Sequence, residues 1–226
     1  MRDTSSTPVS IASDWLAARR FVLAALVALM SGFVALPAAR AATPAETYVS
    51  ENIDKGLQIL KNKQISSTQR AEQFQAFLEG LTDVNRIGRF TLGAARRAAS
   101  PEDVSAFDAA FRNYAAAVYQ SRLAQYSGQT LKVTGSTERQ PGDYVVATQL
   151  VDPAKSSDTQ PLEVDFRVLN EKTRLVVVDV AIAGVWLSIE ERDQFSAFLG
   201  QHNGSIPALV SHLNQLTAQY KSGNSR

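Results

Sequence analysis

The sequence of 226 residues contains no cysteine. This absence excludes disulfide bonds, thiolate metal sites and the acylated cysteine of a lipoprotein, so the folded chain must be stable through its apolar core alone. Histidine is nearly as scarce. His202 and His212 are the only two, and neither lies near a second ligand at a spacing typical of a metal site.

The chain also lacks the local motifs of common enzymes. It has no Gly-x-Ser-x-Gly elbow, no phosphate-binding glycine loop and no cysteine nucleophile. These absences disfavour a hydrolase or a nucleotide-dependent enzyme. We expect no metal and no cofactor.

The longest apolar run, residues 21–36, lies near the N-terminus. Two arginines precede it, and Ala39-Arg40-Ala41 follows it. This order is typical of a secretory signal peptide, and we predict that residues 1–41 are removed by cleavage after Ala41. A retained membrane anchor is the alternative, but a serine and a glycine interrupt the run, which is shorter than the roughly twenty residues that span a bilayer. General secretion is favoured over twin-arginine export because Phe21 directly follows the arginine pair.

Neither sign of charge dominates the mature chain. Removal of residues 1–41 takes away four of 23 basic and two of 22 acidic side chains, which leaves a net charge of −1. Such a balance does not support nucleic-acid binding, which requires a concentrated basic surface. With 45% apolar and 20% charged residues, the composition is that of an ordinary globular protein. We expect a single domain over residues 42–220 and a disordered tail over residues 221–226.

Helical periodicity dominates the first half of this domain. Apolar residues recur at helical spacing over residues 45–61, 66–81 and 83–92. The strongest local signal is Ser100-Pro101-Glu102-Asp103, which combines an N-cap hydroxyl, a proline at the first helical position and two acids at the positive end of the helix dipole. We predict that a long helix begins there and ends at Gly128.

After Gly128 the period changes from about 3.6 to 2, which indicates an antiparallel sheet. The fourth strand is apolar on both faces, so we expect it to be central, with Val178 and Val180 on one face and Asp179 on the other. The predicted strands cover residues 131–138, 144–151, 162–169 and 175–182.

These elements predict an α+β fold, in which helices pack on one face of a curved four-stranded antiparallel sheet, a layering like that of NTF2 and cystatin domains. Two helices complete the fold, one from Ser188 with Glu191 in a capping box and one from Ser205. The apolar faces either interlock into a dry core or stand apart around an apolar cavity. Composition alone favours the dry core.

Asp179 is the one charged residue in the apolar run of residues 176–182. A carboxylate there must be desolvated, paired or functional. We interpret it as a structural acid that accepts hydrogen bonds, with Arg192 as the preferred partner and Arg167 or a loop backbone as alternatives. In the enzyme alternative, Asp179 is the general base of a small-molecule pocket.

Four arginines gather around the third predicted helix and the segment that follows it. They either form a solvated surface or bind a lipid phosphate or an acidic partner through forked hydrogen bonds, and both interpretations stay open. They are Arg86, Arg89, Arg96 and Arg97.

A longer pattern of residues carries a family resemblance. In order and spacing it resembles the periplasmic lipid carriers of the Mla type, the toluene-tolerance family. In the N-terminal half the pattern comprises Asp83, Ile87, Phe90–Gly93, Ser100-Pro101, Phe107, Phe111, Tyr114, Tyr119, Leu123 and Tyr126. In the C-terminal half it comprises Val178-Asp179-Val180, Gly184-Val185, Arg192, Gln194-Phe195, Gly204, Leu209 and Leu213.

The resemblance implies a soluble periplasmic carrier rather than an enzyme. Such a carrier shuttles phospholipid between an inner-membrane complex of the ABC type and an outer-membrane lipid complex, and we expect a monomer. Two positions depart from the family pattern. Trp186 replaces the usual serine, which resembles the hopanoid-associated, HpnM-like branch and suggests a hopanoid-type lipid, and Ala95-Arg96-Arg97 replaces an aromatic-then-basic pair. A third alternative is an adaptor clamped to a transporter, which would have an exposed apolar patch and a closed interior.

A lipid carrier must enclose acyl chains. About thirty methylenes at about 0.8 kcal/mol each oppose free diffusion through water by roughly 24 kcal/mol. We expect Trp186 at the cavity mouth, because its ring is apolar and its N–H is polar. The candidate lipid-binding residues are Phe74, Leu78, Leu81, Ile87, Phe90, Phe107, Phe111, Tyr114, Val118, Val133, Val146, Val164, Phe166, Val168, Val178, Val180, Ile182, Val185 and Trp186.

Overall fold

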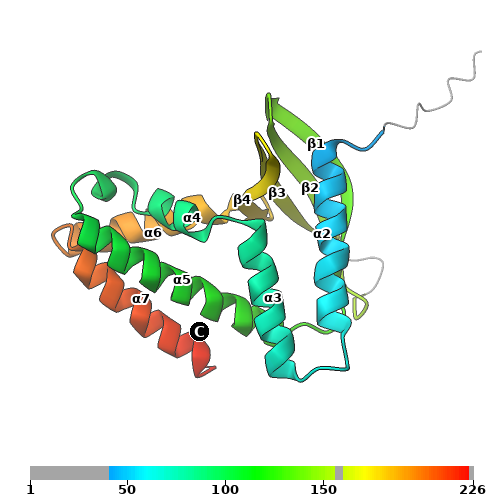
Figure 1. The fold of residues 1–226 in the computed structure, drawn as a ribbon. Coiled ribbons are helices and arrows are strands. Elements are labelled where there is room, and N and C mark those ends of the chain that lie inside the picture. The colour runs from blue at the N-terminus through cyan, green and yellow to red at the C-terminus, as the bar shows by residue number, and fades with distance from the viewer. Residues whose placement is uncertain (1–40, 156–159, 224–226) are drawn as a thin grey trace, which may run out of the picture. The chain divides into compact units, whose positions relative to one another are not determined.

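The computed structural model describes residues 41–155 and 160–223 (Figure 1). The predicted signal peptide lies outside the described residues except for Ala41, so its cleavage stays a prediction. Residues Ala42–Arg226 form one compact unit. No helix in the described part of this unit is long and apolar enough to cross a membrane.

The described residues contain six α-helices and a short 3₁₀-helix. Five of the α-helices begin where a Thr, Ser or Asp side chain accepts a hydrogen bond from a backbone N–H three residues later. The helices are α2 (Pro44–Lys61), α3 (Ser67–Leu81), α4 (Val84–Thr91), η1 (Gly93–Arg97), α5 (Pro101–Ala124), α6 (Leu187–Gln201) and α7 (Ile206–Lys221).

Three predicted helix boundaries were wrong. Helix α5 ends at Ala124, and Gly128 instead lies in the turn before the sheet, with a φ of +111°. Helix α6 begins at Leu187 with no side-chain cap, so the predicted capping box of Ser188 and Glu191 does not form. Helix α7 includes Lys221, where the disordered tail was expected to begin.

Within the described residues, the sheet has five antiparallel strands in the order β1-β2-β3-β4-β5. The fifth strand was not predicted, and it pairs only with the last two residues of β4. Strand β4 is therefore an edge along most of its length rather than a central strand. The strands are β1 (Thr130–Gln140), β2 (Asp143–Val151), β3 (Leu162–Glu171), β4 (Arg174–Ile182) and β5 (Val185–Trp186).

A bulge in β4 changes which side chains share a face. Arg167 pairs with Asp179 and Val168 pairs with Val177, which leaves Val178 without a partner on β3. The face that carries Val177 therefore continues with Val180. The prediction that Val178 and Val180 share a face was wrong, because the extra residue reverses the alternation.

Two separate cores organise this unit. In one, Ala45 and Val49 of α2 pack on Val146 and Val168 of the sheet. In the other, α4, α5, α6 and α7 surround a cluster of aromatic and aliphatic side chains that includes Phe107, whose ring meets that of Phe195 edge to face. In Figure 1, α2 lies along the sheet and α3 lies between α2 and α5. This arrangement is not the single helical layer that NTF2-like layering predicts.

Candidate functional site: two apolar cavities

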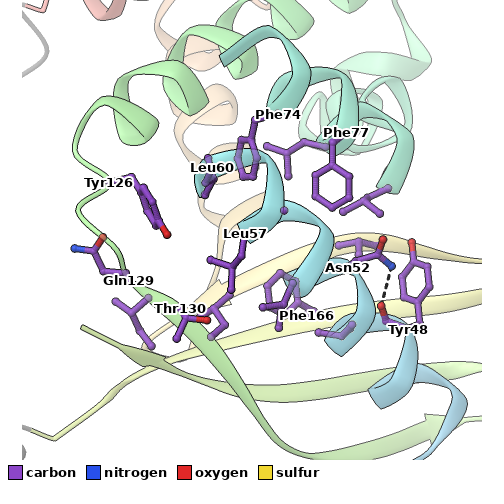
Figure 2. Close-up of a pocket in the computed structure, with 18 residues that line it drawn as sticks. Tyr48, Asn52, Leu57, Leu60, Phe74, Phe77, Tyr126, Gln129, Thr130 and Phe166 are labelled. Atoms are coloured by element: carbon purple, nitrogen blue, oxygen red, sulfur yellow. Dashed lines mark hydrogen bonds between the residues drawn. The ribbon is translucent and has the colours of Figure 1, made fainter. Parts of the chain in front are cut away.

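The first cavity, which we call the α2–α3 cavity, has a volume of about 260 Å³. Its walls come from α2, α3, the segment before β1 and one face of the sheet (Figure 2). They are almost wholly apolar. The lining residues are Tyr48, Val49, Asn52, Ile53, Gly56, Leu57, Leu60, Phe74, Phe77, Leu78, Leu81, Tyr126, Gln129, Thr130, Leu131, Leu150, Phe166 and Val177.

Gly56 sets how closely α2 and α3 approach at this cavity. A Cβ atom at this position would lie 3.2 Å from the ring of Phe77 and 3.3 Å from that of Phe74. A glycine inside a helix makes the helix less stable by about 1 kcal/mol than an alanine would. The close contact gives this glycine a packing role, because it lets two aromatic rings of α3 lie against the backbone of α2. Figure 2 shows Leu57 extending from α2 toward Thr130 of β1.

The second cavity, which we call the α3–α5 cavity, has a volume of about 330 Å³. Leu78, Leu81, Phe166 and Val177 line both cavities, so the two lie next to each other. The remaining walls come from α4, α5, α6 and β4. These additional lining residues are Thr82, Ile87, Thr91, Phe111, Tyr114, Ala115, Val118, Tyr119, Asp179, Val180, Leu187, Ser188 and Glu191.

A few polar groups interrupt these apolar walls. In the α2–α3 cavity, the Asn52 amide donates to the carbonyl of Tyr48 at 2.7 Å. In the α3–α5 cavity, the Tyr114 hydroxyl donates to Glu191 Oε1 at 3.0 Å. Burial raises the pKa of both Tyr114 and Glu191. Three buried oxygens lack a hydrogen-bond partner within the described residues: Thr82 Oγ1, Tyr126 Oη and Glu191 Oε2.

Asp179 was predicted to pair with Arg192, but it does not. It accepts hydrogen bonds from the backbone N–H of Val180 at 2.9 Å, from that of Ser188 at 3.1 Å, and from the Ser188 hydroxyl. Helix α6 has no N-cap side chain of its own, and its first N–H groups need acceptors. Asp179 therefore caps α6 from the neighbouring strand. Its carboxylate is occupied by these contacts, which leaves the general-base alternative without structural support.

The arginine predicted to bind Asp179 has other contacts. The Arg192 guanidinium pairs with exposed Asp193 and lies 5.4 Å from the centroid of the Phe90 ring. Arg167, the second predicted partner, forms two hydrogen bonds with Asp143. Strand pairing places Arg167 opposite Asp179, but Arg167 is not its hydrogen-bond donor. The chain reverses in a tight turn after β4, in which Ala183 and Gly184 both have positive φ. This turn returns Ser188 to Asp179.

The four arginines of the predicted phosphate or partner site do not converge. Arg86 pairs with Glu171, and Arg89 pairs with Asp108. Arg96 and Arg97 are exposed on η1. None of the four lines either cavity.

The model of the MlaC protein family matches residues 50–215. The chain belongs to the MlaC family. The matched region includes all five strands and the walls of both cavities except Tyr48 and Val49. Membership confirms the resemblance to Mla-type carriers.

The MlaC-family fold also occurs in a solved structure. The phospholipid-binding protein from Ralstonia solanacearum, solved in complex with a phospholipid, superposes with a TM-score of 0.68 at 22% sequence identity. The match covers 79% of this chain and 99% of that chain. At this identity the likeness establishes a shared fold.

The MlaC-family structure places the predicted lipid-binding residues in several environments. Nine line one or both cavities: Phe74, Leu78, Leu81, Ile87, Phe111, Tyr114, Val118, Phe166 and Val180. Phe90 and Val178 line a smaller pocket, together with Arg167 and Asp179. Phe107, Val133, Val146 and Val168 pack in the two cores. Val164, Ile182, Val185 and Trp186 lie on β3, β4 and β5 and line neither cavity.

Trp186 therefore does not stand at the mouth of either cavity. It pairs with Ala181 in the short strand β5. The geometry therefore does not support the hopanoid-type cargo that Trp186 suggests. The HpnM-like assignment remains an interpretation of sequence.

The contribution of α2 to the cavity walls was not predicted. Seven residues of this helix, from Tyr48 to Leu60, line the α2–α3 cavity. Gly56 was the available signal, because a glycine inside an otherwise amphipathic helix commonly marks a close contact. Glu191 was also missed as a cavity residue, because its spacing from Ser188 indicated a capping box.

Proposed function

We propose that this MlaC-family protein is a periplasmic carrier of phospholipids. It moves lipid between an inner-membrane complex of the ABC type and an outer-membrane lipid complex, and it catalyses no reaction. The observation that carries the proposal is the pair of adjacent apolar cavities between the helices and the sheet. The shared fold with a phospholipid-binding protein supports the same cargo.

The cavities suit hydrocarbon chains rather than whole phospholipids. Pockets for small ligands have volumes of about 300–1,000 Å³. The α3–α5 cavity lies at the lower end of this range, and the α2–α3 cavity lies just below it. Burial of each methylene stabilises the complex by about 0.8 kcal/mol, so a few methylenes in each cavity already favour binding over water. The acyl chains therefore occupy the cavities, and the head group stays near solvent.

The lack of cationic side chains among the described residues of the cavity walls also favours a lipid whose head group stays outside the cavities. No lysine or arginine lines either cavity within the described residues, so a buried phosphate would have no cationic partner. Arg96 and Arg97 are exposed and form no ion pair in the described part of the chain. They are better candidates than Arg86 or Arg89 to meet a phosphate or an acidic partner surface.

Lipid extraction and native mass spectrometry of the purified mature protein test the proposal. We expect phospholipid to co-purify with residues 42–226. Leu57→Trp places a large ring between α2 and the sheet, and we expect it to reduce the retained phospholipid by about tenfold or more. Gln58→Trp is the matched control, because Gln58 is exposed on the same helix and lines neither cavity.

Two outcomes would contradict the carrier function. The first is a wild-type protein free of lipid after purification from a lipid-rich host. The second is equal lipid retention by Leu57→Trp and Gln58→Trp, since the cavity would then not hold the lipid. An adaptor with a closed interior predicts the first outcome.

A further inference from the structure

An exposed apolar segment lies where β4 turns into β5 and α6. It comprises residues 182–187, Ile-Ala-Gly-Val-Trp-Leu, and we call it the apolar tip. Its tryptophan is half-buried, and its other five residues are exposed. The exposed fractions are 40% for Ile182, 50% for Val185 and 38% for Leu187. Exposed apolar patches commonly mark contact with a protein or a membrane, so the tip is a candidate docking surface.

The turn of the apolar tip carries an apolar residue where a polar one is usual. Ala183 and Gly184 both have positive φ, +49° and +81°. A two-residue turn of this kind favours Asn or Asp before the glycine, because their short polar side chains tolerate a left-handed backbone. Alanine instead presents a methyl group to solvent. The Ala183 N–H donates to the Glu163 carbonyl at 3.0 Å, which ties the turn to β3. The tip is therefore apolar at its apex and held in place by the sheet.

The apolar tip continues one wall of the α3–α5 cavity. Leu187 lines this cavity and is also exposed. Val180 lines it too, and Ile182 follows two residues later on the same face of β4. Ile182 pairs with Val185 across the turn. An apolar surface thus leads from the cavity wall to the tip.

The size of the apolar tip favours one kind of partner. A stable protein interface needs about 800 Å² and roughly 20–30 residues from each side, whereas the tip supplies residues 182–187 alone. A bilayer surface accepts a small apolar insertion, and tryptophan is enriched at the boundary between hydrocarbon and head groups. A lipid that leaves the cavity beside such a surface also reaches the bilayer without exposing its chains to water.

The acids beside the apolar tip limit how deeply it can insert. Glu163, whose carbonyl accepts from Ala183, and Glu190, three residues after Leu187, are both exposed. A carboxylate is strongly disfavoured in hydrocarbon, so both side chains stay in water. The tip can therefore enter only the outermost part of a bilayer.

We propose that the apolar tip docks the protein on a lipid bilayer by shallow insertion, and that the adjoining α3–α5 cavity exchanges its lipid there. The inference rests on the proposed function and deepens it, because it names the surface at which cargo enters and leaves. Ile182 and Val185 line neither cavity, so docking can be weakened without changing the cavity walls.

Flotation with protein-free vesicles tests this proposal. Mature protein is mixed with dioleoyl phosphatidylcholine vesicles, with or without dioleoyl phosphatidylglycerol, and the vesicle-bound fraction is measured after density-gradient centrifugation. We expect the wild type to bind neutral vesicles. Val185→Glu should reduce binding by about tenfold or more, because a charged group replaces an inserted apolar one.

Val151→Glu is the matched control for Val185→Glu. Val151 is 46% exposed at the end of β2, and strands β3 and β4 separate it from the tip. The two variants carry the same change of charge, so a general electrostatic effect would alter both equally. We expect Val151→Glu to bind vesicles within about twofold of the wild type. Both variants should retain as much co-purified phospholipid as the wild type, which shows that the fold and the cavities are intact.

Tryptophan fluorescence gives a second measurement at the apolar tip. The chain has two tryptophans, and removal of residues 1–41 takes away Trp15, which leaves Trp186 as the one intrinsic probe. We expect neutral vesicles to shift its emission to shorter wavelength and to protect it from quenching by acrylamide. Val185→Glu should show neither change.

The outcomes separate this inference from the carrier function. If the purified wild type carries no phospholipid, the carrier function itself fails. A lipid-loaded wild type that does not bind protein-free vesicles overturns only the docking proposal, and it assigns the tip to a protein partner instead. Equal binding by Val185→Glu and Val151→Glu, or binding only to vesicles that contain phosphatidylglycerol, also overturns the docking proposal, since another surface then contacts the bilayer.

Discussion

At the residue scale, Asp179 links the sheet to the helix that follows it. The residue is 8% exposed, and its carboxylate accepts three hydrogen bonds, two of them from Ser188. A helix start without its own cap side chain leaves N–H groups unpaired, and an anion near these groups is also favoured by the helix dipole. An acid on an otherwise apolar strand is therefore explained by the first turn of α6.

We expect Asp179→Asn to lower the free energy of unfolding by about 1–3 kcal/mol, because the neutral amide accepts fewer hydrogen bonds and turns its NH₂ group toward donors. Urea denaturation followed by circular dichroism measures the change. Asp193→Asn is the control, since the Asp193 side chain is 67% exposed and pairs only at the surface. Equal stabilities of the two variants would show that Asp179 does not cap α6.

The ion pair of Asp143 and Arg167 makes the stability of the fold depend on pH. The two hydrogen bonds from Arg167 hold the pKa of Asp143 below its ordinary value of 3.8. Because the folded-state pKa is the lower one, the unfolded chain binds the proton first as pH falls. The stability from this pair is therefore complete above about pH 4 and is lost as pH falls through the folded-state pKa.

Arg167→Met tests this dependence. We expect the variant to be less stable than the wild type by about 1–3 kcal/mol at neutral pH, since Asp143 is buried while Arg167 is partly screened by solvent. The difference should shrink below pH 4, where Asp143 becomes protonated. Urea denaturation across pH measures it. A difference that stays constant with pH, as expected for the exposed control Arg122→Met, would contradict the role of the pair.

At the element scale, glycine determines how closely helices pack. A Cβ atom at Gly88 of α4 would lie 2.7 Å from Cδ1 of Phe111 on α5. Phe111 belongs to the helical core and also lines the α3–α5 cavity. The contact between α4 and α5 therefore holds one wall of that cavity in place.

We expect Gly88→Ala to destabilise the protein by about 1–3 kcal/mol, because the added methyl displaces the Phe111 ring by more than the gain in helix propensity can offset. Gly80→Ala is the matched control, since nothing lies within 4 Å of a Cβ at that helical position. It should stabilise the protein by about 0.5–1 kcal/mol. Thermal and urea unfolding measure both variants, and a stabilised Gly88→Ala would refute the close contact.

At the scale of the whole molecule, the two cores leave unfilled apolar space between them. Side chains around a cavity lose packing contacts, so the unliganded fold is less stable than one with a filled interior. A ligand that binds only the folded state restores part of this stability. Bound lipid is therefore expected to raise the stability of the folded state.

We expect removal of lipid by organic extraction to lower the melting temperature by roughly 5–10 °C, which corresponds to ligand present at about 100 times its Kd. Addition of phosphatidylglycerol vesicles should restore it in proportion to the logarithm of lipid concentration. Differential scanning calorimetry measures both changes. Leu57→Trp is expected to show neither change, and a wild type that is insensitive to lipid would refute the linkage.

The sequence alone determined the features that depend on near neighbours. The residues Ser66, Ser100 and Ser205 marked three helix starts, because each of their capping hydrogen bonds spans three residues. Alternation located four strands to within two residues at each end. The family was also recognisable from sequence, since the order and spacing of residues 83–213 do not depend on how the elements pack.

Tertiary structure decided the features that join distant parts of the chain. Strand pairing placed the bulge at Val178, and the turn after β4 gave Asp179 its partner Ser188 in place of Arg192. The walls of the cavities depended on α2 reaching the sheet. Apolar stripes look the same whether they close into a core or line a hollow, because the spacing of the helices is set by long-range packing and not by the local pattern.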